Sequence, residues 1–416
     1  MEHRRKSADY GAGNARVLIV GAGPAGATLA FLLASRGVRV TLIERETDFA
    51  RVFRGEALMP LGIDALHQMG LGGILSELPA RNVESWEFYV AGKSLFRVDE
   101  PQEELGDRAV RVVSQPAFLE RVVTEARRQP SFSFLPGTTA RELLTEDGRV
   151  VGILAETAES PRELRADLVI GCDGRGSVLR TRSGLHLELL PESYDVLWFK
   201  MPAPERLRGR CSVMMFGTVK RTALCYTSWD DRLQYALLLP KGGYRALRET
   251  DWAEELGEPL PRWLAGHVRS VRDLLEGPVR LNVLVGRCSR WSAPGLLLLG
   301  DAAHPMSPVR AQGINIALRD TLVAANHLVP ALGEGPEAVD TAARAVHIER
   351  EPEVVRAQTL QLREARGQTN ARLRPVMIAA ARLLAPVLGR TQWAKRRWLH
   401  QQRELRFGST DVRLRV

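Results

Sequence analysis

The sequence predicts an α/β protein that has a discontinuous nucleotide-binding domain, an inserted β-rich domain and a helical C-terminal region. Short apolar segments recur near residues 20, 170 and 300, and each runs into a glycine, which is typical of buried parallel strands. Residues 188–282 alternate mainly as strands do, whereas residues 340–407 have an almost continuous helical pattern. The predicted domains are 15–80, 110–185 and 285–340 for nucleotide binding, 81–109 and 186–284 for the β-rich domain, and 341–416 for the helical region.

The first element is a complete βαβ unit. The apolar segment Arg16–Val20 predicts a strand, Ala27–Ser35 a helix that ends at Gly37, and Val38–Ile43 a second strand. The intervening Gly21-Ala-Gly-Pro-Ala-Gly26 has the spacing that dinucleotides require in a Rossmann-like unit.

Each glycine of that motif has a physical role. Gly21 permits the tight turn, Gly23 lets the backbone approach a pyrophosphate, and Gly26 lets the helix pack on the strand, with Ala25 between them. Glu44, followed by Arg45, ends the second strand, where its carboxylate can accept hydrogen bonds from ribose hydroxyls. This unit alone does not decide between NAD and FAD.

Further elements follow in order. Strands are expected at Val83–Val98, Phe132–Ile153, Ala166–Gly171, Val196–Met201, Ser212–Gly217, Thr222–Ser228, Gln234–Leu239 and Leu296–Leu299. Helices are expected at Leu61–Met69, Ser114–Arg128, Trp252–Leu256, Pro261–Leu275 and from Gly313 onward.

Composition excludes several classes of protein. The 416 residues include nothing near the roughly 18 consecutive apolar residues of a membrane span, and no signal peptide precedes the first strand. The four cysteines show neither a CxxC pair nor His/Cys ligand spacing, so we expect no metal site and no redox disulfide. A cytoplasmic protein follows from these features.

The net charge of +9 is concentrated in the C-terminal tail, where eleven Lys and Arg residues after Ala371 face only Glu404 and Asp411. The rest of the chain is therefore close to neutral, and we expect no nucleic-acid partner.

Two further motifs distinguish the dinucleotide. Gly171-Cys-Asp173-Gly174 is followed by Arg180, and Gly300-Asp301-Ala-Ala-His304-Pro305 is followed by Pro308 and by Gln312-Gly313-Ile314-Asn315. Together with the first glycine motif, these segments resemble the three fingerprints of the group A flavoprotein monooxygenases, the para-hydroxybenzoate hydroxylase type. The resemblance covers roughly residues 16–330 and implies bound FAD.

The resemblance also implies roles for individual residues. Asp301 would accept a hydrogen bond from a ribityl hydroxyl, and the N–H groups of Gly313, Ile314 and Asn315 would face the flavin pyrimidine ring from a helix N-terminus. Asp173 and Arg180 match the pair that shapes the approach of FAD and nicotinamide. Arg54 and Gln115 match positions that contact FAD phosphate and ribityl groups, although a surface salt bridge and a helix cap are the alternatives for these two.

Two residues are the candidates for a catalytic role. Arg310 stands where the family has small residues, and it either forms an ordinary ion pair or orients an acidic or phenolate substrate. His304 belongs to the FAD-binding signature, which assigns it a positioning role; action as a general base is the alternative. No residue is assigned firmly to catalysis.

The activity that the resemblance implies is NAD(P)H- and O2-dependent hydroxylation or epoxidation through a flavin C4a-hydroperoxide. NADH or NADPH would bind transiently, and the substrate would be a bulky aromatic, quinone or quinolone-like molecule of secondary metabolism. Halogenation, dehydrogenation and prenyl reduction on the same scaffold remain alternatives, as does a non-catalytic flavin-binding protein.

The substrate pocket is expected between the flavin and the β-rich domain. Alternation along the inserted strands suggests Met214, Phe216, Tyr226 and Tyr235 as wall residues, with membership of the core as the competing interpretation.

The tail carries a second binding hypothesis. The apolar segment Leu373–Leu388 precedes Trp393 and Trp398, which flank Lys395-Arg-Arg397. Such a combination predicts either peripheral binding of residues 373–407 to anionic lipid, at the inner face of the membrane, or packing on the FAD domain. The chain is expected to be a monomer or homodimer.

Overall fold

The computed structural model describes residues 16–50, 56–191, 194–247, 250–369, 375–376, 378–380 and 391–416. Arg54 and most of the apolar segment 373–388 lie outside these residues.

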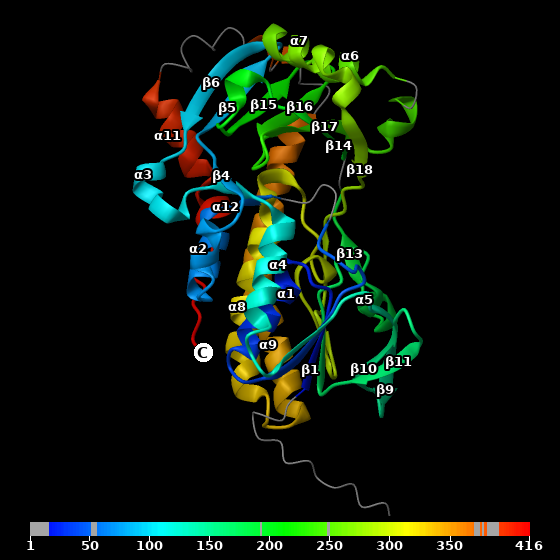
Figure 1. Cartoon of the computed structure of the whole chain (residues 1–416). Coiled ribbons are helices and arrows are strands. Elements are labelled where there is room, and N and C mark those ends of the chain that lie inside the picture. The colour runs from blue at the N-terminus through cyan, green and yellow to red at the C-terminus, as the bar shows by residue number, and fades with distance from the viewer. Residues whose placement is uncertain are drawn as a thin grey trace, which may run out of the picture.

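The nucleotide-binding part is built on a six-stranded sheet in the lower half of Figure 1. Four neighbouring pairs are parallel and only the edge pair is antiparallel. The order is β20 (Ser292–Ala293), β21 (Leu296–Leu298), β12 (Leu168–Gly171), β1 (Arg16–Val20), β2 (Arg39–Ile43) and β8 (Phe132–Leu135). The inner strands β1, β12 and β21 are buried almost completely, as the sequence predicted for parallel strands, whereas the edge strands β20 and β8 are partly exposed.

Long helices pack beside this sheet. α1 (Pro24–Ala34) contacts α4 (Gln115–Ala126) and α8 (Gln312–Ala331), and α8 also packs along α9 (Pro336–Thr369). The four helices run nearly along the long axis of the molecule (Figure 1). α8 is buried on nearly all sides, which is expected for a helix that packs between other layers.

The β-rich part is a seven-stranded sheet that Figure 1 shows at the opposite end of the molecule. Its order is β18 (Glu276–Leu281), β14 (Tyr194–Pro202), β17 (Arg232–Pro240), β16 (Thr222–Thr227), β15 (Ser212–Gly217), β5 (Ser85–Val90) and β6 (Lys93–Asp99). α6 (Trp252–Gly257) and α7 (Arg262–Ser270) cover its outer face. The chain thus leaves the parallel sheet twice to build this second one.

Smaller elements complete the fold. Three short sheets contain β3 (Ala57–Leu58), β7 (Arg111–Val113) and β4 (Ala80–Asn82); β11 (Pro161–Arg165), β10 (Arg149–Glu156) and β9 (Thr139–Glu146); and β13 (Leu187–Leu189) with β19 (Gly286–Cys288). The remaining helices are α2 (Pro60–Gln68), α3 (Gln102–Leu105), α5 (Val178–Arg182), α11 (Gln392–Gln401) and α12 (Arg403–Phe407).

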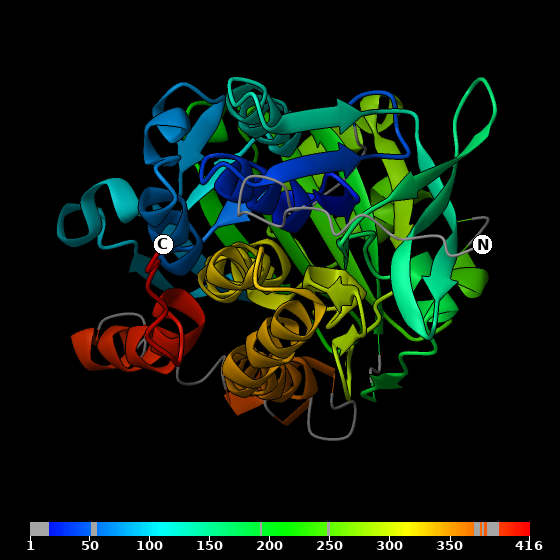
Figure 2. The same cartoon turned by 90° about the horizontal axis from the view of Figure 1, so that it is seen from below.

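The C-terminal segment is tied into the body of the protein. Figure 2 shows its helices beside the α2 region. Arg406 of α12 forms a buried ion pair with Glu100, and Gln68 of α2 bonds to the backbone of Val412 and Leu414. Trp398 of α11 packs against Trp86, with the two rings tilted and 5.8 Å between their centroids. The C-terminal segment from Trp398 to Leu414 therefore packs on the body of the protein.

Most predicted elements are present within a few residues. The helix predicted to reach Leu275 is wrong in its length, because α7 ends at Ser270 and β18 begins at Glu276. β18 is an edge strand, where Pro278 is tolerated although it lacks an N–H group. Among the described residues, no helix is both long and apolar enough to cross a membrane.

Candidate functional site

The three glycine-bearing motifs meet at the C-terminal edge of the parallel sheet. A Cβ atom on Gly21 would lie 2.4 Å from the carbonyl oxygen of Cys172, so the first motif touches the second. At Gly300 a Cβ would lie 3.5 Å from Ala25 and also from Ala317, so the third motif packs between α1 and α8. Close approach at these points requires glycine and small residues.

The N-terminus of α1 has an open approach. Gly23 caps the helix without a side-chain hydrogen bond, and a Cβ built on it meets nothing within 4 Å. The Glu44 carboxylate is buried beside this helix end and accepts the N–H groups of Ala22 at 2.8 Å and of Glu46 at 3.2 Å. Arg45, in contrast, pairs with Glu46 at the surface. An anionic group fits in front of Gly23, where free N–H groups and the helix dipole point.

The second motif organises backbone turns. Asp173 Oδ2 accepts the N–H groups of Val178 and Leu179, and the turn passes through Gly174 at a φ of +79°. Arg180 donates to the carbonyl oxygens of Ala302 and Arg175. Asp173 and Arg180 therefore each hold a turn rather than each other.

Asp173 also has a spare acceptor. Its Oδ1 is buried without a hydrogen-bond partner among the described residues, and burial raises the pKa of this carboxyl. A ligand that supplies a donor would satisfy this atom.

The N-terminus of α8 forms a second open helix end. Arg310 and Ala311 both have positive φ, 59° and 51°, and Ala311 caps α8 without a side-chain hydrogen bond. Two successive left-handed residues turn the chain sharply after Pro308. Asp301 Oδ1 would lie 3.8 Å from a Cβ on Gly313, so the structure brings these two predicted cofactor residues together.

The remaining predicted cofactor residues lie around this helix end. Ile314 and Asn315 are buried in its first turn, and the Asn315 side chain accepts from the Met59 N–H and donates to the Ala57 carbonyl oxygen. The Asn315 side chain therefore joins α8 to β3 and α2. Its backbone N–H is the group that remains for the expected contact with the flavin pyrimidine ring. Gln115 is buried at the start of α4.

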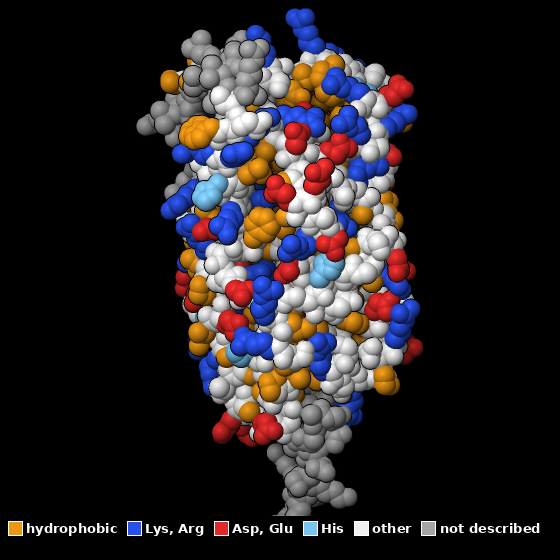
Figure 3. Space-filling model, turned by 90° about the vertical axis from the view of Figure 1, so that its left-hand side faces the viewer, with side chains coloured by type: hydrophobic (Ala, Val, Ile, Leu, Met, Phe, Trp, Pro, Cys, Tyr) orange, Lys and Arg blue, Asp and Glu red, His pale blue; other side chains and the backbone are white. Residues whose placement is uncertain are grey.

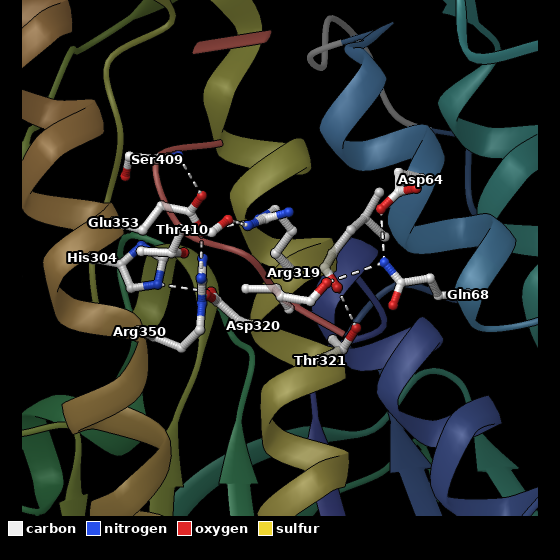
Figure 4. A network of polar contacts seen from close by, with 12 residues as sticks. Asp64, Gln68, His304, Arg319, Asp320, Thr321, Arg350, Glu353, Ser409 and Thr410 are labelled. Atoms are coloured by element: carbon white, nitrogen blue, oxygen red, sulfur yellow. Dashed lines mark hydrogen bonds and ion pairs between the residues drawn. The ribbon is translucent and has the colours of Figure 1, made fainter. Parts of the chain in front are cut away.

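His304 lies in a buried network of charged groups (Figure 4). Its side chain is 1% exposed, and its Nε2 lies 2.8 Å from Asp320 Oδ2. Trp291 packs on the imidazole, with 4.6 Å between ring centroids. This enclosure supports a positioning role and leaves little access for substrate.

The network continues beyond His304 through α8 and α9. Arg350 donates to Asp320 at 2.8 Å and to Glu353, and Glu353 also accepts from Arg319 at 3.0 Å. Burial would raise the pKa of the Asp320 carboxyl, but the charges of His304 and Arg350 outweigh it and lower that pKa. Glu353 also accepts the N–H of Ser409, so the network joins the C-terminal segment to the motif that contains His304.

Arg310 forms an ion pair. Its guanidinium donates twice to Glu364 of α9, at 3.0 Å through Nε, and lies about equally far over Trp86 and Trp398, at 5.2 and 5.0 Å from the ring centroids. Of the two interpretations of Arg310, the structure supports the ordinary ion pair.

Three of the four predicted substrate-wall residues face away from this site. Met214, Phe216 and Tyr235 belong to the core beneath α6 and α7, and the Tyr235 hydroxyl donates to the Leu256 carbonyl oxygen. Tyr226 has the opposite parity and faces the nucleotide-binding part, where its hydroxyl approaches Glu56 at 3.4 Å. The prediction that these four lie together is wrong, because alternate residues of a strand face opposite sides.

The inner face of the seven-stranded sheet carries other side chains, which the sequence reasoning missed. Pairing aligns Lys200, Gln234 and Tyr226 in one row and Trp198, Ala236 and Leu224 in the next. Trp198, Leu224 and Val309, the last in the turn before α8, all pack against one small apolar core that contains Ala236. The row with Tyr226 therefore lies beside the chain that leads into the open helix end.

Glu56 also escaped the sequence reasoning. Its carboxylate accepts from Ser228 at 2.6 Å and from Gln234 at 3.3 Å, both on the inserted sheet. Burial raises its pKa to about 7, and the hydrogen bond from Ser228 and the charge of Lys200 offset only part of this effect. No sequence signal marks it, because its partners lie more than 160 positions away.

The arrangement fits FAD better than an isolated nucleotide. One open helix end with a carboxylate beside it lies at Gly23 and Glu44, and a second open helix end lies near Asp301. A dinucleotide extended between the two would place a ring system beneath the inner face of the seven-stranded sheet. Among the described residues, no group of three His, Cys, Asp or Glu side chains gathers as a metal site.

Comparisons with known proteins agree with this geometry. A family model described as an FAD binding domain matches residues 14–358. The chain is 34% identical over 387 residues to a 6-methylpretetramide 4-monooxygenase of Streptomyces rimosus, with 90% of each chain covered. It is 29% identical over 348 residues to the ubiquinone hydroxylase UbiL of Rhodospirillum rubrum, covering 78% of this chain and 75% of that protein.

A solved structure shares the fold. The p-nitrophenol 4-monooxygenase PnpA of Pseudomonas putida superposes with a TM-score of 0.72 at 19% identity, covering 95% of this chain and 98% of the other.

Proposed function

From the membership of this chain in the FAD-binding domain family, which makes it an FAD-dependent monooxygenase that uses NAD(P)H and O2, we propose that it hydroxylates or epoxidises a bulky aromatic molecule of secondary metabolism. The observation that carries the substrate class is the inner face of the seven-stranded sheet. Trp198, Leu224 and Tyr226 present a broad, mainly apolar surface with polar groups at one end. Such a surface suits a flat polycyclic ring that carries hydroxyl groups.

We also propose which residues hold the cofactor. The backbone at Gly21, Gly23 and Gly26 takes the pyrophosphate and Glu44 the adenosine ribose. Asp301 binds the ribityl chain, and the first turn of α8 places its positive dipole end at the pyrimidine ring. The bound FAD supplies the redox chemistry with NAD(P)H and O2, while the protein orients the substrate and excludes water.

A self-contained monooxygenase accepts electrons directly from NAD(P)H. We expect NADH or NADPH, mixed without oxygen with the purified yellow protein, to bleach the flavin absorption with no partner reductase present. An aromatic substrate should accelerate that step. A flavin that is reduced only when a separate reductase is added would contradict the proposal of a one-component enzyme.

A peripheral membrane contact remains a proposal for the tail. Trp393 of α11 is 67% exposed, and Arg396 and Arg397 beside it are also exposed. Elsewhere on the face of the molecule that bears α11, acidic and basic side chains are interspersed (Figure 3). Each basic side chain near an anionic surface contributes about 1 kcal/mol, so this cluster could hold a cytoplasmic monomer or homodimer at the inner leaflet.

Vesicle co-sedimentation tests the membrane contact. We expect the protein to sediment with vesicles that contain anionic lipid, less so as salt is added, and least after charge reversal at Lys395, Arg396 and Arg397. Charge reversal at Arg128, an exposed arginine just after α4, should have little effect. Equal recovery in the supernatant with neutral and with anionic vesicles would contradict the membrane contact.

A further inference from the structure

A small polar cluster stands at one end of the apolar inner face. It consists of the Glu56 carboxylate and three donors from the inserted sheet: the Ser228 hydroxyl at 2.6 Å, the Gln234 amide at 3.3 Å and the Tyr226 hydroxyl at 3.4 Å. The carboxylate belongs to the segment that enters β3, whereas the donors belong to β16, β17 and the turn between them. The cluster therefore bridges the two parts of the molecule where a substrate ring would lie.

The cluster has an unfilled position. Gln234 is 3% exposed, and its Oε1 has no hydrogen-bond partner among the residues that the structure describes. A buried amide oxygen without a donor is unfavourable, and a ligand O–H group would satisfy it. Since the amide nitrogen of the same side chain bonds to Glu56, a ligand hydroxyl that meets Gln234 Oε1 also lies close to the Glu56 carboxylate.

The cluster is close to the predicted flavin end of the site. The residue after Glu56, Ala57, accepts a hydrogen bond from Asn315 in the first turn of α8 at 3.1 Å. Trp198 and Leu224, in the next row of the same sheet face, pack against a small apolar core that Val309, in the turn before that helix, also borders. A ring held over these rows would have its hydroxyl at Glu56 and its carbon edge toward the helix end.

We propose that Glu56 is the substrate-binding base of this enzyme: its carboxylate, with Tyr226 and Gln234, binds the acidic hydroxyl of a phenolic or enolic substrate and accepts its proton. The O–H bond of the substrate breaks and an O–H bond forms on Glu56, with no change of oxidation state. The resulting aryloxide is more electron-rich than the neutral ring, so it reacts more readily with an electrophilic oxygen. This inference rests on the proposed function and names the recognition group within that site.

The charged surroundings suit a base that works near neutral pH. Burial raises the pKa of Glu56 to about 7. The groups that face it are Lys200 of β14, which pairs with Asp230 at 2.5 Å, the Tyr226 hydroxyl and the Cys211 thiol, whose own pKa burial raises to about 12. Lys200 supplies the only positive charge among these groups and stabilises the ionised carboxylate. Above pH 7 Glu56 is ready to accept a proton, and below it is already protonated.

Binding of naphthols to the flavin-loaded enzyme tests the proposal without knowledge of the natural substrate. We expect 1-naphthol and 2-naphthol to perturb the flavin absorption, and their affinity to rise with pH through a midpoint near 7. Glu56→Gln should weaken naphthol binding above the midpoint by about tenfold and abolish the midpoint, because the amide cannot accept the proton. The corresponding naphthyl methyl ethers, which carry no acidic proton, should bind wild type and variant equally.

Two further variants separate a chemical role of Glu56 from a structural one. Ser228→Ala removes a hydrogen bond that lowers the pKa of Glu56, so the midpoint should move to higher pH. Glu87→Gln is the matched control, because Glu87 also accepts a tyrosine hydroxyl, from Tyr89 at 2.7 Å, but on the outer face of the sheet. It should leave the midpoint and the naphthol affinity unchanged.

Several outcomes would overturn the assignment. They are equal affinity of wild type for naphthols and their ethers, an unchanged midpoint in Glu56→Gln, and no detectable binding of either naphthol. Flavin content and reduction by NAD(P)H, measured on the same preparations, report on the proposed function separately. An enzyme that is yellow and reducible but indifferent to Glu56→Gln keeps its proposed function and loses this inference.

Discussion

A Gly23→Leu variant is expected to fold but to purify without flavin. Gly23 faces open space at the N-terminus of α1, so a leucine side chain meets no protein atom within 4 Å of its Cβ. It would instead occupy the place in which a pyrophosphate approaches the helix. Loss of two charge-assisted hydrogen bonds, each contributing about 1.5–3 kcal/mol, weakens FAD binding by at least about a hundredfold. Flavin absorbance per protein after gel filtration measures the effect.

Two other glycines are the controls for this experiment. Gly26 is only three residues away, but a Cβ there would lie 1.9 Å from the Gly21 carbonyl oxygen, so Gly26→Ala should destabilise the fold by about 3 kcal/mol. Gly266 is exposed on α7, where Gly266→Leu should retain both fold and flavin. A Gly23→Leu protein that keeps wild-type flavin affinity would disprove the assignment of this helix end to the pyrophosphate.

The second large effect is expected at Arg350, which is buried completely within the network of Figure 4. Arg350→Met removes the guanidinium that donates hydrogen bonds to Asp320 and Glu353. The two buried carboxylates then have less positive charge beside them. Breaking a buried ion pair in this way costs about 3–5 kcal/mol. The midpoint of urea unfolding should fall accordingly, whereas Arg128→Met at the exposed pair with Glu125 should cost no more than about 0.5 kcal/mol.

The loss of stability caused by Arg350→Met should become smaller as the pH is lowered. Opposite charges lower the pKa values of Asp320 and Glu353 against the effect of burial. A carboxyl group whose pKa is lower in the folded than in the unfolded protein stabilises the fold at pH values above its unfolded pKa of about 4. This stabilisation is lost as the pH falls through the pKa of the folded protein. The stability gap between wild type and Arg350→Met should therefore narrow in acid. A gap that stays constant down to the acid unfolding transition would show that the lost energy is packing rather than charge.

The sequence predicted the parallel sheet well because its strands are buried on both faces. Arg16–Val20 and the segment ending at Gly171 are continuous apolar runs, and glycines stand where backbones touch, as at Gly21 and Cys172. Backbones can approach this closely only where one residue lacks a side chain, so the glycines in the sequence mark these contacts directly. Shorter strands were missed, since β3 and β7 have too few residues to display a period.

The inserted sheet shows where sequence reasoning failed. Alternation divides β16 correctly into two sets, Ala223 and Cys225 on one face and Leu224 and Tyr226 on the other. Both sets are largely apolar, because α6 and α7 cover the outer face as fully as the nucleotide-binding part covers the inner one. The pattern therefore could not indicate which face carries the site, and the larger outward side chains were chosen wrongly.

Polar sites formed by distant segments were equally hidden. Glu56 meets Ser228 and Gln234 only because β3 lies under the inserted sheet, and Arg310 meets Glu364 only because α9 returns along α8. The residue types at these positions carry no signal of such pairing.

Labelling with ¹⁸O2 tests the central claim most directly. The purified enzyme, supplied with NAD(P)H and a panel of phenols, quinones and quinolones, is incubated under ¹⁸O2 and the products are weighed by mass spectrometry. A monooxygenase places one oxygen atom from O2 into the product, so a hydroxylated or epoxidised product should carry one ¹⁸O label, and the Gly23→Leu protein should form none. Product oxygen that comes from water, or a halogenated product that appears only when halide is added, would contradict the account.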